Sequence, residues 1–360
     1  MKRFKGFILC LALTFSIPFA ALSQGVNSYF PPTDSQDWEK VPLNSLGWDN
    51  ASLAELLSWL PTQGTRSFMI VKDGKIAVEE YWGAKLTGMG NMDEEAMWYW
   101  DDAGRTLTAA LVGIAEKNGF LKIKDRTSKY LGEAWSSVPE KREKEIRILN
   151  QLSMSTGLDE RIEDPRDTST EALKFFAKAG ERWAYHDAPY TLLMNTLENA
   201  TNQSISAFFK ERLATQIGMK GFWQETGGDL VFFSDARSMS KFGLLLMNEG
   251  EWEGNQILDK KYVQAMTSSS QQDNPGYGFL TWLNSGDVFK LPGNQVPNKG
   301  KMIAAAPEDM FMALGKNGQL LMVIPSQGLV IVRQGTYSND SIVPQRLLQD
   351  LWQKLNRVIN

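Results

Sequence analysis

The chain has 360 residues, enough for one large mixed domain or for two or three domains of about 100–200 residues each, and its hydrophobic (42%) and charged (22%) fractions exclude a wholly disordered protein. Lys and Arg number 38 against 42 Asp and Glu, so no basic field recruits nucleic acid. Cys10 and His186 are the only cysteine and histidine, which excludes a Cys/His zinc cage; we expect neither metal nor cofactor.

Residues 1–23 have the pattern of a secretory signal peptide. A positive start, Lys2-Arg3-Phe4-Lys5, precedes an apolar stretch that ends in Ala21-Leu22-Ser23, with small residues three and one before a cleavage point at Gln24. Pro18 interrupts this stretch, which is shorter than the roughly 20 residues of a membrane span. The remainder has 35 basic and 42 acidic side chains, hence a charge of −7, and no cysteine. We expect a secreted or periplasmic protein with no membrane insertion after signal removal.

The first predicted elements follow a polar lead-in. Residues 24–50 are predicted to wrap the domain or to stay mobile. A short amphipathic helix is predicted over 53–60, and a β-hairpin over 67–72 and 75–82, because an Asp73-Gly74 turn separates two apolar runs.

The middle of the chain, 106–300, has a mostly helical pattern. Apolar residues recur at three- and four-residue spacing over 106–118, 172–179, 190–199, 206–215 and 235–248. Strands are predicted again at 310–314, 320–325 and 329–334, followed by a closing amphipathic helix over 345–358.

This order of elements predicts an α/β (α+β) fold. We expect an antiparallel sheet flanked by helices, built from 51–95 and 301–360, that together with the inserted, mainly helical part makes one domain over 51–360. A ligand cleft is expected between the sheet part and the helical part.

Three short segments carry polar side chains suited to such a cleft: Trp98-Tyr-Trp-Asp-Asp-Ala-Gly-Arg105, Tyr185-His186-Asp187 and Gly315-Lys-Asn-Gly-Gln319. With them, and with Leu152-Ser-Met-Ser-Thr-Gly157, the chain resembles the penicillin-recognising serine hydrolases over most of 50–360. Within this family it is most similar to the branch of class C-type β-lactamases, carboxylesterases and 6-aminohexanoate-oligomer hydrolases. The resemblance implies a serine β-lactamase/DD-peptidase-like fold.

The resemblance also implies site positions. The family uses a Ser-x-x-Lys motif, in which Ser attacks a carbonyl and Lys accepts its proton, helped by a Tyr. Carried over, the Ser position is Asp102, the Lys position is Arg105 and the Tyr position is kept by Tyr185. Asp187 replaces the usual Asn, and Lys316-Asn317-Gly318 matches the third motif, so Asp187, Lys316, Asn317 and Gly318 are the implied substrate-binding residues.

The two substitutions remove the chemistry of the family. Arg, with a pKa above about 12, cannot accept a proton near neutrality, and an Asp carboxylate offers no hydroxyl to acylate. Asp102 and Arg105 stand three apart at a helix start, so we predict a fixed salt bridge in the pocket. The predicted function is therefore non-covalent binding of a small-molecule amide or peptide-like ligand. The alternative is an active esterase, amidase or peptidase that uses an unorthodox or misassigned nucleophile.

Other residues have competing interpretations. Asp101 and Asp102 either cap the helix or form a pair of working acids. Ser238 and Lys241 form the only literal Ser-x-x-Lys, but no Tyr and Lys-x-Gly motifs follow in order, so a structural role is favoured. His186 is expected to pack or to form hydrogen bonds rather than to catalyse. Six aromatic residues either line a pocket or fill the core: Trp98, Tyr99, Trp100, Tyr277, Phe279 and Trp282.

Overall fold

The structure of the chain is a computed structural model that describes residues 29–35, 37–338 and 341–359. The predicted signal peptide, 1–23, lies outside the described residues. Within the described part of the chain, no helix is long and apolar enough to cross a membrane.

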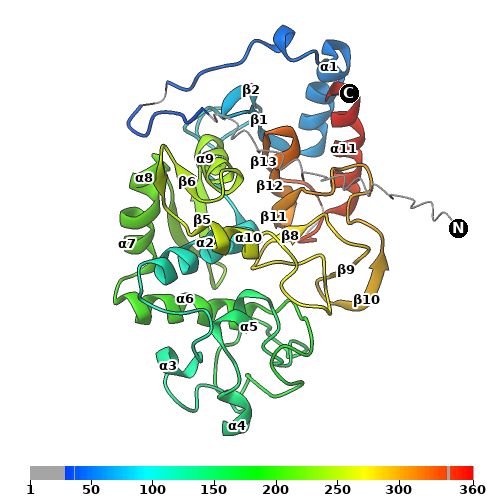
Figure 1. The fold of residues 1–360 in the computed structure, drawn as a ribbon. Helices are drawn as coiled ribbons and strands as arrows, with labels where there is room; N and C mark the ends of the chain where they lie inside the picture. The colour runs from blue at the N-terminus through cyan, green and yellow to red at the C-terminus, as the bar shows by residue number, and fades with distance from the viewer. Residues whose placement is uncertain (1–28, 36, 339–340, 360) are drawn as a thin grey trace, which may run out of the picture.

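The element order largely follows the predicted one (Figure 1). The strands are β1 Thr65–Lys72, β2 Lys75–Tyr81, β3 Trp98–Tyr99, β4 Phe222–Thr226, β5 Asp229–Ser234, β6 Glu251–Trp252, β7 Asn255–Gln256, β8 Trp282–Leu283, β9 Val288–Leu291, β10 Asn294–Lys299, β11 Phe311–Gly315, β12 Gln319–Ile324 and β13 Leu329–Gly335. The α-helices are α1 Asn50–Trp59, α2 Gly104–Lys117, α3 Ser128–Leu131, α4 Glu140–Glu143, α5 Ile148–Leu152, α6 Asp187–Thr201, α7 Ile205–Phe209, α8 Thr215–Ile217, α9 Ala236–Met247, α10 Lys260–Met266 and α11 Gln345–Ile359.

The main sheet combines strands from both ends of the domain. Its strand order is β2-β1-β13-β12-β11-β8, and every neighbouring pair is antiparallel. The first hairpin is confirmed. Asp73 and Gly74 both have positive φ, 50° and 87°, the conformation of a tight hairpin turn. A Cβ on Gly74 would lie 1.7 Å from the carbonyl oxygen of Tyr29, so only glycine fits.

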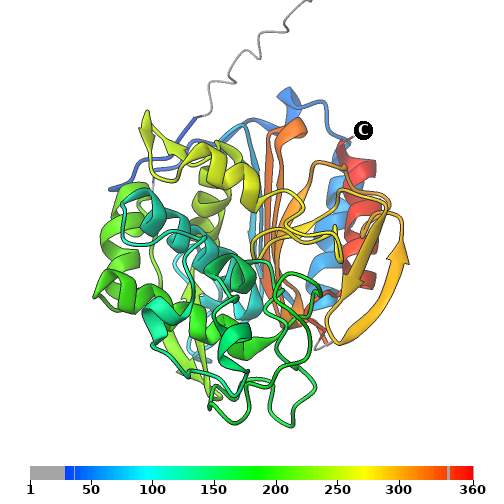
Figure 2. The ribbon, with the colours of Figure 1, turned by 60° about the horizontal axis from the view of Figure 1, so that its bottom comes forward.

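Helices cover both faces of this sheet (Figure 2). α1 and α11, from opposite ends of the chain, lie side by side on one face. α9 contacts β1, β12 and β13 on the other face, and α2 lies between β11 and α6. The Asp235 carboxylate caps α9 by accepting a hydrogen bond from the N–H of Ser238 at 2.6 Å, which explains why this helix starts where the sequence predicts.

The inserted part contains more β-structure than expected. β4, β5 and β3 form a small sheet, and β8 belongs to the main sheet. The helix predicted over 172–179 is wrong. There the chain folds back on Gly157, whose carbonyl oxygen accepts from the N–H groups of Phe176 and Ala177, while Leu158 and Phe175 form an isolated bridge. Phe176 stays exposed beneath two arginines instead of joining a buried helical stripe.

The described part of the lead-in wraps the domain, one of the two outcomes expected for it. Lys40 forms a parallel bridge with Ile76 of β2, and the indole N–H of Trp38 donates to the Gly74 carbonyl at 2.7 Å. These contacts lay the segment along the edge strand of the sheet and cover its unpaired backbone groups.

Candidate active site

The start of α2 forms the centre of the site. A single 3-10 turn, Asp101–Ala103, connects β3 to α2, and the buried Trp100 anchors it through a hydrogen bond from the indole N–H to Ser234 Oγ at 2.7 Å. β11 passes directly alongside: a Cβ on Gly315 would lie 2.4 Å from the Trp100 carbonyl oxygen. Glycine at 315 therefore lets the β11–β12 turn, which carries Lys316, approach the beginning of α2.

The predicted ion pair is present in the site. Arg105 Nη2 lies 2.6 Å from Asp102 Oδ1, and the same nitrogen pairs with the Asp187 carboxylate. The Tyr185 hydroxyl donates to Asp102 Oδ1 at 3.1 Å. The side chains of Asp102 and Arg105 are only 6% and 8% exposed, so this network is shielded from solvent. The structure thus brings four of the sequence-predicted residues into direct contact.

Two tyrosines enclose the Arg105 guanidinium. Its Cζ lies 4.5 Å from the Tyr185 ring centroid and 4.6 Å from that of Tyr190, within cation–π range. The Tyr190 hydroxyl is fixed by Thr108 Oγ1 at 3.0 Å. Arg105 Nε and Nη1 are buried without a hydrogen-bond partner. The guanidinium is thus held in place by its carboxylate partners and the two rings.

Titration behaviour follows from this burial. Burial raises the pKa of Asp102 to about 6, against the attraction of Arg105. Although burial opposes its charge, Tyr185, Asp102 and Asp187 hold the pKa of Arg105 well above its ordinary value. Burial also raises the pKa of Tyr185 well above its ordinary value. Near neutral pH, neither Arg105 nor Tyr185 is therefore able to accept a proton.

The interpretation of Asp101 and Asp102 as helix caps is wrong. α2 has no side-chain cap, because Asp102 turns to Arg105. Asp101 Oδ1 instead accepts hydrogen bonds from the N–H groups of Asp102, at 2.8 Å, and Lys316, at 3.3 Å. Burial disfavours its ionised form, but the hydrogen bonds from Asp102 and the charge of Lys316 outweigh it and lower the pKa of Asp101. The two acids therefore have different principal partners, although both side chains line one cavity.

A cavity of about 60 Å³ opens onto this network. Its wall includes five residues that the sequence singled out, namely Asp101, Asp102, Arg105, Asp187 and Lys316. It also includes residues that were not anticipated: Tyr190, Thr191 and Met194 of α6, and Asp229, Leu230 and Val231 of β5. A neighbouring space of about 230 Å³ shares part of this wall and continues between α6 and the β4–β5 hairpin. The Gly227-Gly228 pair, shortly before the apolar run 230–233, is the signal that could have revealed this hairpin.

Asn317 and Gly318 were implied as substrate-binding residues, but neither is part of the cavity wall. The Asn317 amide donates to the Tyr99 hydroxyl at 3.0 Å, and a Cβ on the buried Gly318 would lie 2.6 Å from Arg333 Nη1. The buried Arg333 donates to the Gly318 carbonyl at 2.6 Å. Asn317 and Gly318 shape the turn that presents Lys316, because the carbonyl groups of this turn accept hydrogen bonds from the buried Arg333 guanidinium.

The alternative nucleophile is enclosed. Ser238 and Lys241 lie on α9 and are 3% and 6% exposed. Ser238 Oγ accepts from the N–H of Lys220 at 2.8 Å, and the Lys241 ammonium donates to the carbonyls of Pro32 and Gly218 at 3.1 and 2.9 Å. The adjoining cavity of about 10 Å³ has room for about one water. This arrangement fits the structural role favoured for Ser-x-x-Lys.

His186 is packed inside the protein. It is 2% exposed, and neither ring nitrogen has a hydrogen-bond partner. Burial lowers the pKa of His186 to about 4, so the ring is neutral at pH 7. The structure therefore shows the packing role that was expected for His186.

The aromatic residues fill the core behind the cavity. The Tyr185 ring stacks on Trp282 with centroids 5.8 Å apart, and Tyr277 meets Trp282 edge-on at 4.8 Å. Trp100 is fully buried against Phe232. Tyr277 and Trp282 therefore support Tyr185, and none of the six aromatic residues lines the cavity.

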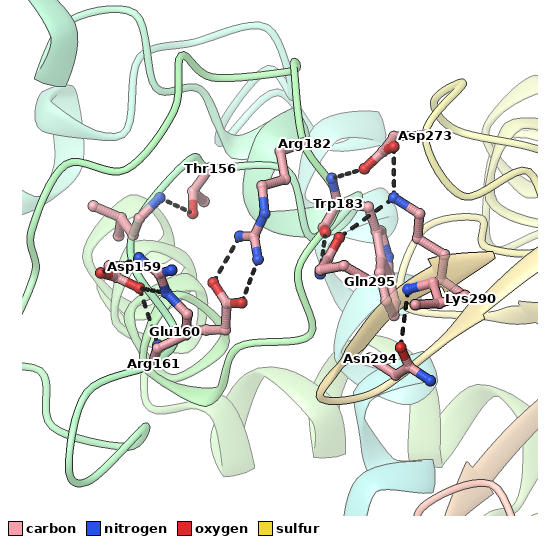
Figure 3. A network of polar contacts seen from close by, with 12 residues as sticks. Thr156, Asp159, Glu160, Arg161, Arg182, Trp183, Asp273, Lys290, Asn294 and Gln295 are labelled. Carbon is pink, nitrogen blue, oxygen red and sulfur yellow. Dashed lines mark hydrogen bonds and ion pairs between the residues drawn. The ribbon is translucent and has the colours of Figure 1, made fainter.

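A polar clamp holds the segment that carries Tyr185 (Figure 3). Asp273 accepts from the N–H of Trp183 at 2.9 Å, and the Gln295 amide donates to the Trp183 carbonyl at 3.1 Å. Lys290 joins the two side chains, donating to Asp273 at 2.6 Å and to Gln295 at 3.3 Å. On the other side, Arg182 pairs with Glu160, as Figure 3 shows. Sequence reasoning missed this clamp because its members are scattered over more than 100 residues.

Replacing Lys290 is expected to loosen the clamp. Lys290→Met removes a cation whose side chain is only 10% exposed and leaves Asp273 and Gln295 without a bridge. We expect unfolding to become easier by about 1–3 kcal/mol, the range for hydrogen bonds to charged groups. Urea denaturation would measure the change, with Lys299→Met on the exposed strand β10 as the control. Equal midpoints for the two variants would show that the clamp contributes nothing.

An antiparallel sheet with helices on both faces, and a cavity at the start of a buried helix, is the architecture of serine hydrolases of the penicillin-recognising type. A β-lactamase family model matches residues 64–342, which is most of the chain. The chain belongs to the β-lactamase family.

Solved structures show the same fold. A protein described as a 6-aminohexanoate-dimer hydrolase, from Bacillus anthracis, aligns with a TM-score of 0.67 and 17% identity, covering 92% of this chain and 91% of that one. A family VIII carboxylesterase aligns with a TM-score of 0.66 and 15% identity, covering 88% of this chain and 99% of that one. A protein described as a β-lactamase, from Bacteroides dorei DSM 17855, aligns with a TM-score of 0.65 and 16% identity, covering 87% of this chain and 99% of that one. No curated protein matches the sequence significantly. At these identities the similarity establishes the fold alone.

Proposed function

We propose that this member of the β-lactamase family binds an amide- or peptide-like ligand in the cavity at the start of α2 and forms no acyl-enzyme there. The observation that carries the proposal is the buried network of Asp102, Arg105, Asp187 and Tyr185. Acyl transfer needs a hydroxyl or thiol nucleophile and a group that takes up its proton. The nucleophile position holds a carboxylate, and the base position holds a guanidinium that stays protonated.

The cavity wall supports a ligand with mixed polarity. Lys316 and Asp187 present opposite charges to it, while Met194 and Leu230 add apolar surface. The adjoining space between α6 and the β4–β5 hairpin extends the site, which suits an elongated chain of amide groups. The signal-peptide pattern of 1–23 supports the further proposal that binding takes place in the periplasm or outside the cell.

Intact-mass spectrometry tests the absence of an acyl-enzyme. The full chain is incubated with benzylpenicillin and, separately, with a fluorophosphonate, and an active DD-peptidase, whose acyl-enzyme with penicillin persists, serves as the positive control. We expect no mass increase for this chain and a stoichiometric adduct for the control. An adduct on any serine would contradict the proposal and support the active hydrolase.

A binding measurement completes the test. N-acetyl-alanyl-alanine amide is titrated into the isotope-labelled chain, and the backbone NMR signals of the cavity wall are followed. Saturable shifts at Thr191, Leu230 and Lys316, without an adduct, are expected because these residues surround the cavity. Shifts that never saturate would overturn the proposed ligand class.

A further inference from the structure

One oxygen of Asp101 collects two backbone donors at the edge of the cavity. Asp101 Oδ1 lies 2.8 Å from the nitrogen of Asp102 and 3.3 Å from the nitrogen of Lys316, and both N–H groups donate to it. The second donor, Lys316, lies 215 residues further along the chain than Asp101. Two backbone N–H groups that converge on one oxygen are the arrangement with which acyl-transfer sites hold a developing oxyanion.

The backbone is built to bring these donors together. Gly315 allows β11 to approach Trp100 so closely that a Cβ would lie 2.4 Å from its carbonyl oxygen. Asp101 itself has a φ of 52°, a left-handed conformation that is uncommon outside glycine. Strained backbone of this kind persists where the surrounding structure enforces it, and it clusters at functional sites. The convergence therefore depends on two special backbone positions rather than on a mobile side chain alone.

We propose that the Asp101 carboxylate is a built-in occupant of the N–H groups of Asp102 and Lys316 and closes them to other oxygen atoms. In this state the carbonyl oxygen of a bound ligand cannot reach the two donors. The inference rests on the proposed function, since it concerns the same cavity, and adds that the ligand binds there without placing a carbonyl on these N–H groups. The lowered pKa of Asp101, which burial alone would raise, agrees with a carboxylate that is stabilised by its donors.

Two substitutions separate the oxygen of Asp101 from its charge. Asp101→Asn keeps a side-chain oxygen that can accept both hydrogen bonds but removes the charge. Asp101→Gly removes the oxygen and adopts the left-handed backbone without strain, so it is the variant that should open the site and still fold. Asp101→Ala also removes the oxygen and serves to separate this effect from the added flexibility of glycine.

Acetate is the probe, because it is a small oxyanion that needs no chemical reaction to report on the site. It is titrated into isotope-labelled protein, and the amide NMR signals of Asp102 and Lys316 are followed. We expect no change at these two amides in the parent chain and in Asp101→Asn. In Asp101→Gly and Asp101→Ala, both amides should shift together and saturate with one dissociation constant in the millimolar range.

Three results would overturn the inference. Saturable shifts of both amides in the parent chain would show that Asp101 does not occupy the donors. Absence of shifts in correctly folded Asp101→Gly and Asp101→Ala, or equal shifts in Asp101→Asn, would show that no such site is uncovered. Failure of the proposed function has a different signature, a covalent adduct with benzylpenicillin or a fluorophosphonate, so the two failures are distinguishable.

Discussion

Asp102→Ser combined with Arg105→Lys is expected to give the chain a measurable acylation reaction. The pair introduces a hydroxyl and a base of adjustable pKa at the two positions where a carboxylate and a guanidinium lie 2.6 Å apart. Tyr185 already points its hydroxyl at position 102, at 3.1 Å. Because a positioned base contributes about 10²–10⁴-fold, we expect p-nitrophenyl acetate hydrolysis to rise by about 10²-fold over the parent chain.

The single variants identify the source of this gain. Asp102→Ser alone keeps Arg105 as its only partner at the base position, and a guanidinium takes up no proton, so no gain is expected. Adding Asp101→Gly to the double variant should raise the rate by about another 10²-fold, the value of an oxyanion donor, because the N–H groups of Asp102 and Lys316 become free. A single Asp102→Ser variant as active as the double variant would show that Arg105 is not what blocks the chemistry.

The sequence predicted correctly those turns and helix starts that depend on residues close together along the chain. The Asp73-Gly74 turn and the Asp235 cap of α9 lie beside the elements they start or join, so the sequence signal and its structural effect are neighbours. The ion pair of Asp102 and Arg105 was also predictable, because a three-residue spacing on a helix brings the two side chains together.

The missed features depend on contacts between distant segments. The helix predicted over 172–179 does not form, because Phe176 and Ala177 donate hydrogen bonds to the Gly157 carbonyl instead. No pattern within that segment reveals these hydrogen bonds. Asp101 has local signs of a helix cap, but its actual partner is Lys316, which reaches it only because β11 passes alongside. Resemblance placed Asn317 beside Lys316 in the cleft, whereas its amide turns to Tyr99. In each case tertiary packing overrides a sound local preference.

Arg105→Met is expected to lower the free energy of unfolding by about 3–5 kcal/mol at pH 8, because it leaves the buried Asp102 carboxylate without its cation. Asp102, with a side chain 6% exposed, then loses its cation but keeps the hydrogen bond from the Tyr185 hydroxyl, and Asp187 loses its pairing too. Urea denaturation at pH 8 and pH 5 measures the effect. Asp102→Asn combined with Arg105→Met is the matched control, since it removes both charges and should regain much of the lost stability.

The loss caused by Arg105→Met should shrink as the pH falls. Burial already raises the pKa of Asp102 to about 6 with the guanidinium present, and without that cation the pKa rises further. A carboxyl whose pKa is higher in the folded than in the unfolded chain binds more protons when folded, so its contribution to stability increases as the pH drops between those two values. The gap between parent and variant is therefore expected to be smaller at pH 5 than at pH 8. An equal gap at both pH values would mean that Arg105 stabilises the fold through its packing between Tyr185 and Tyr190 and not by compensating a buried charge.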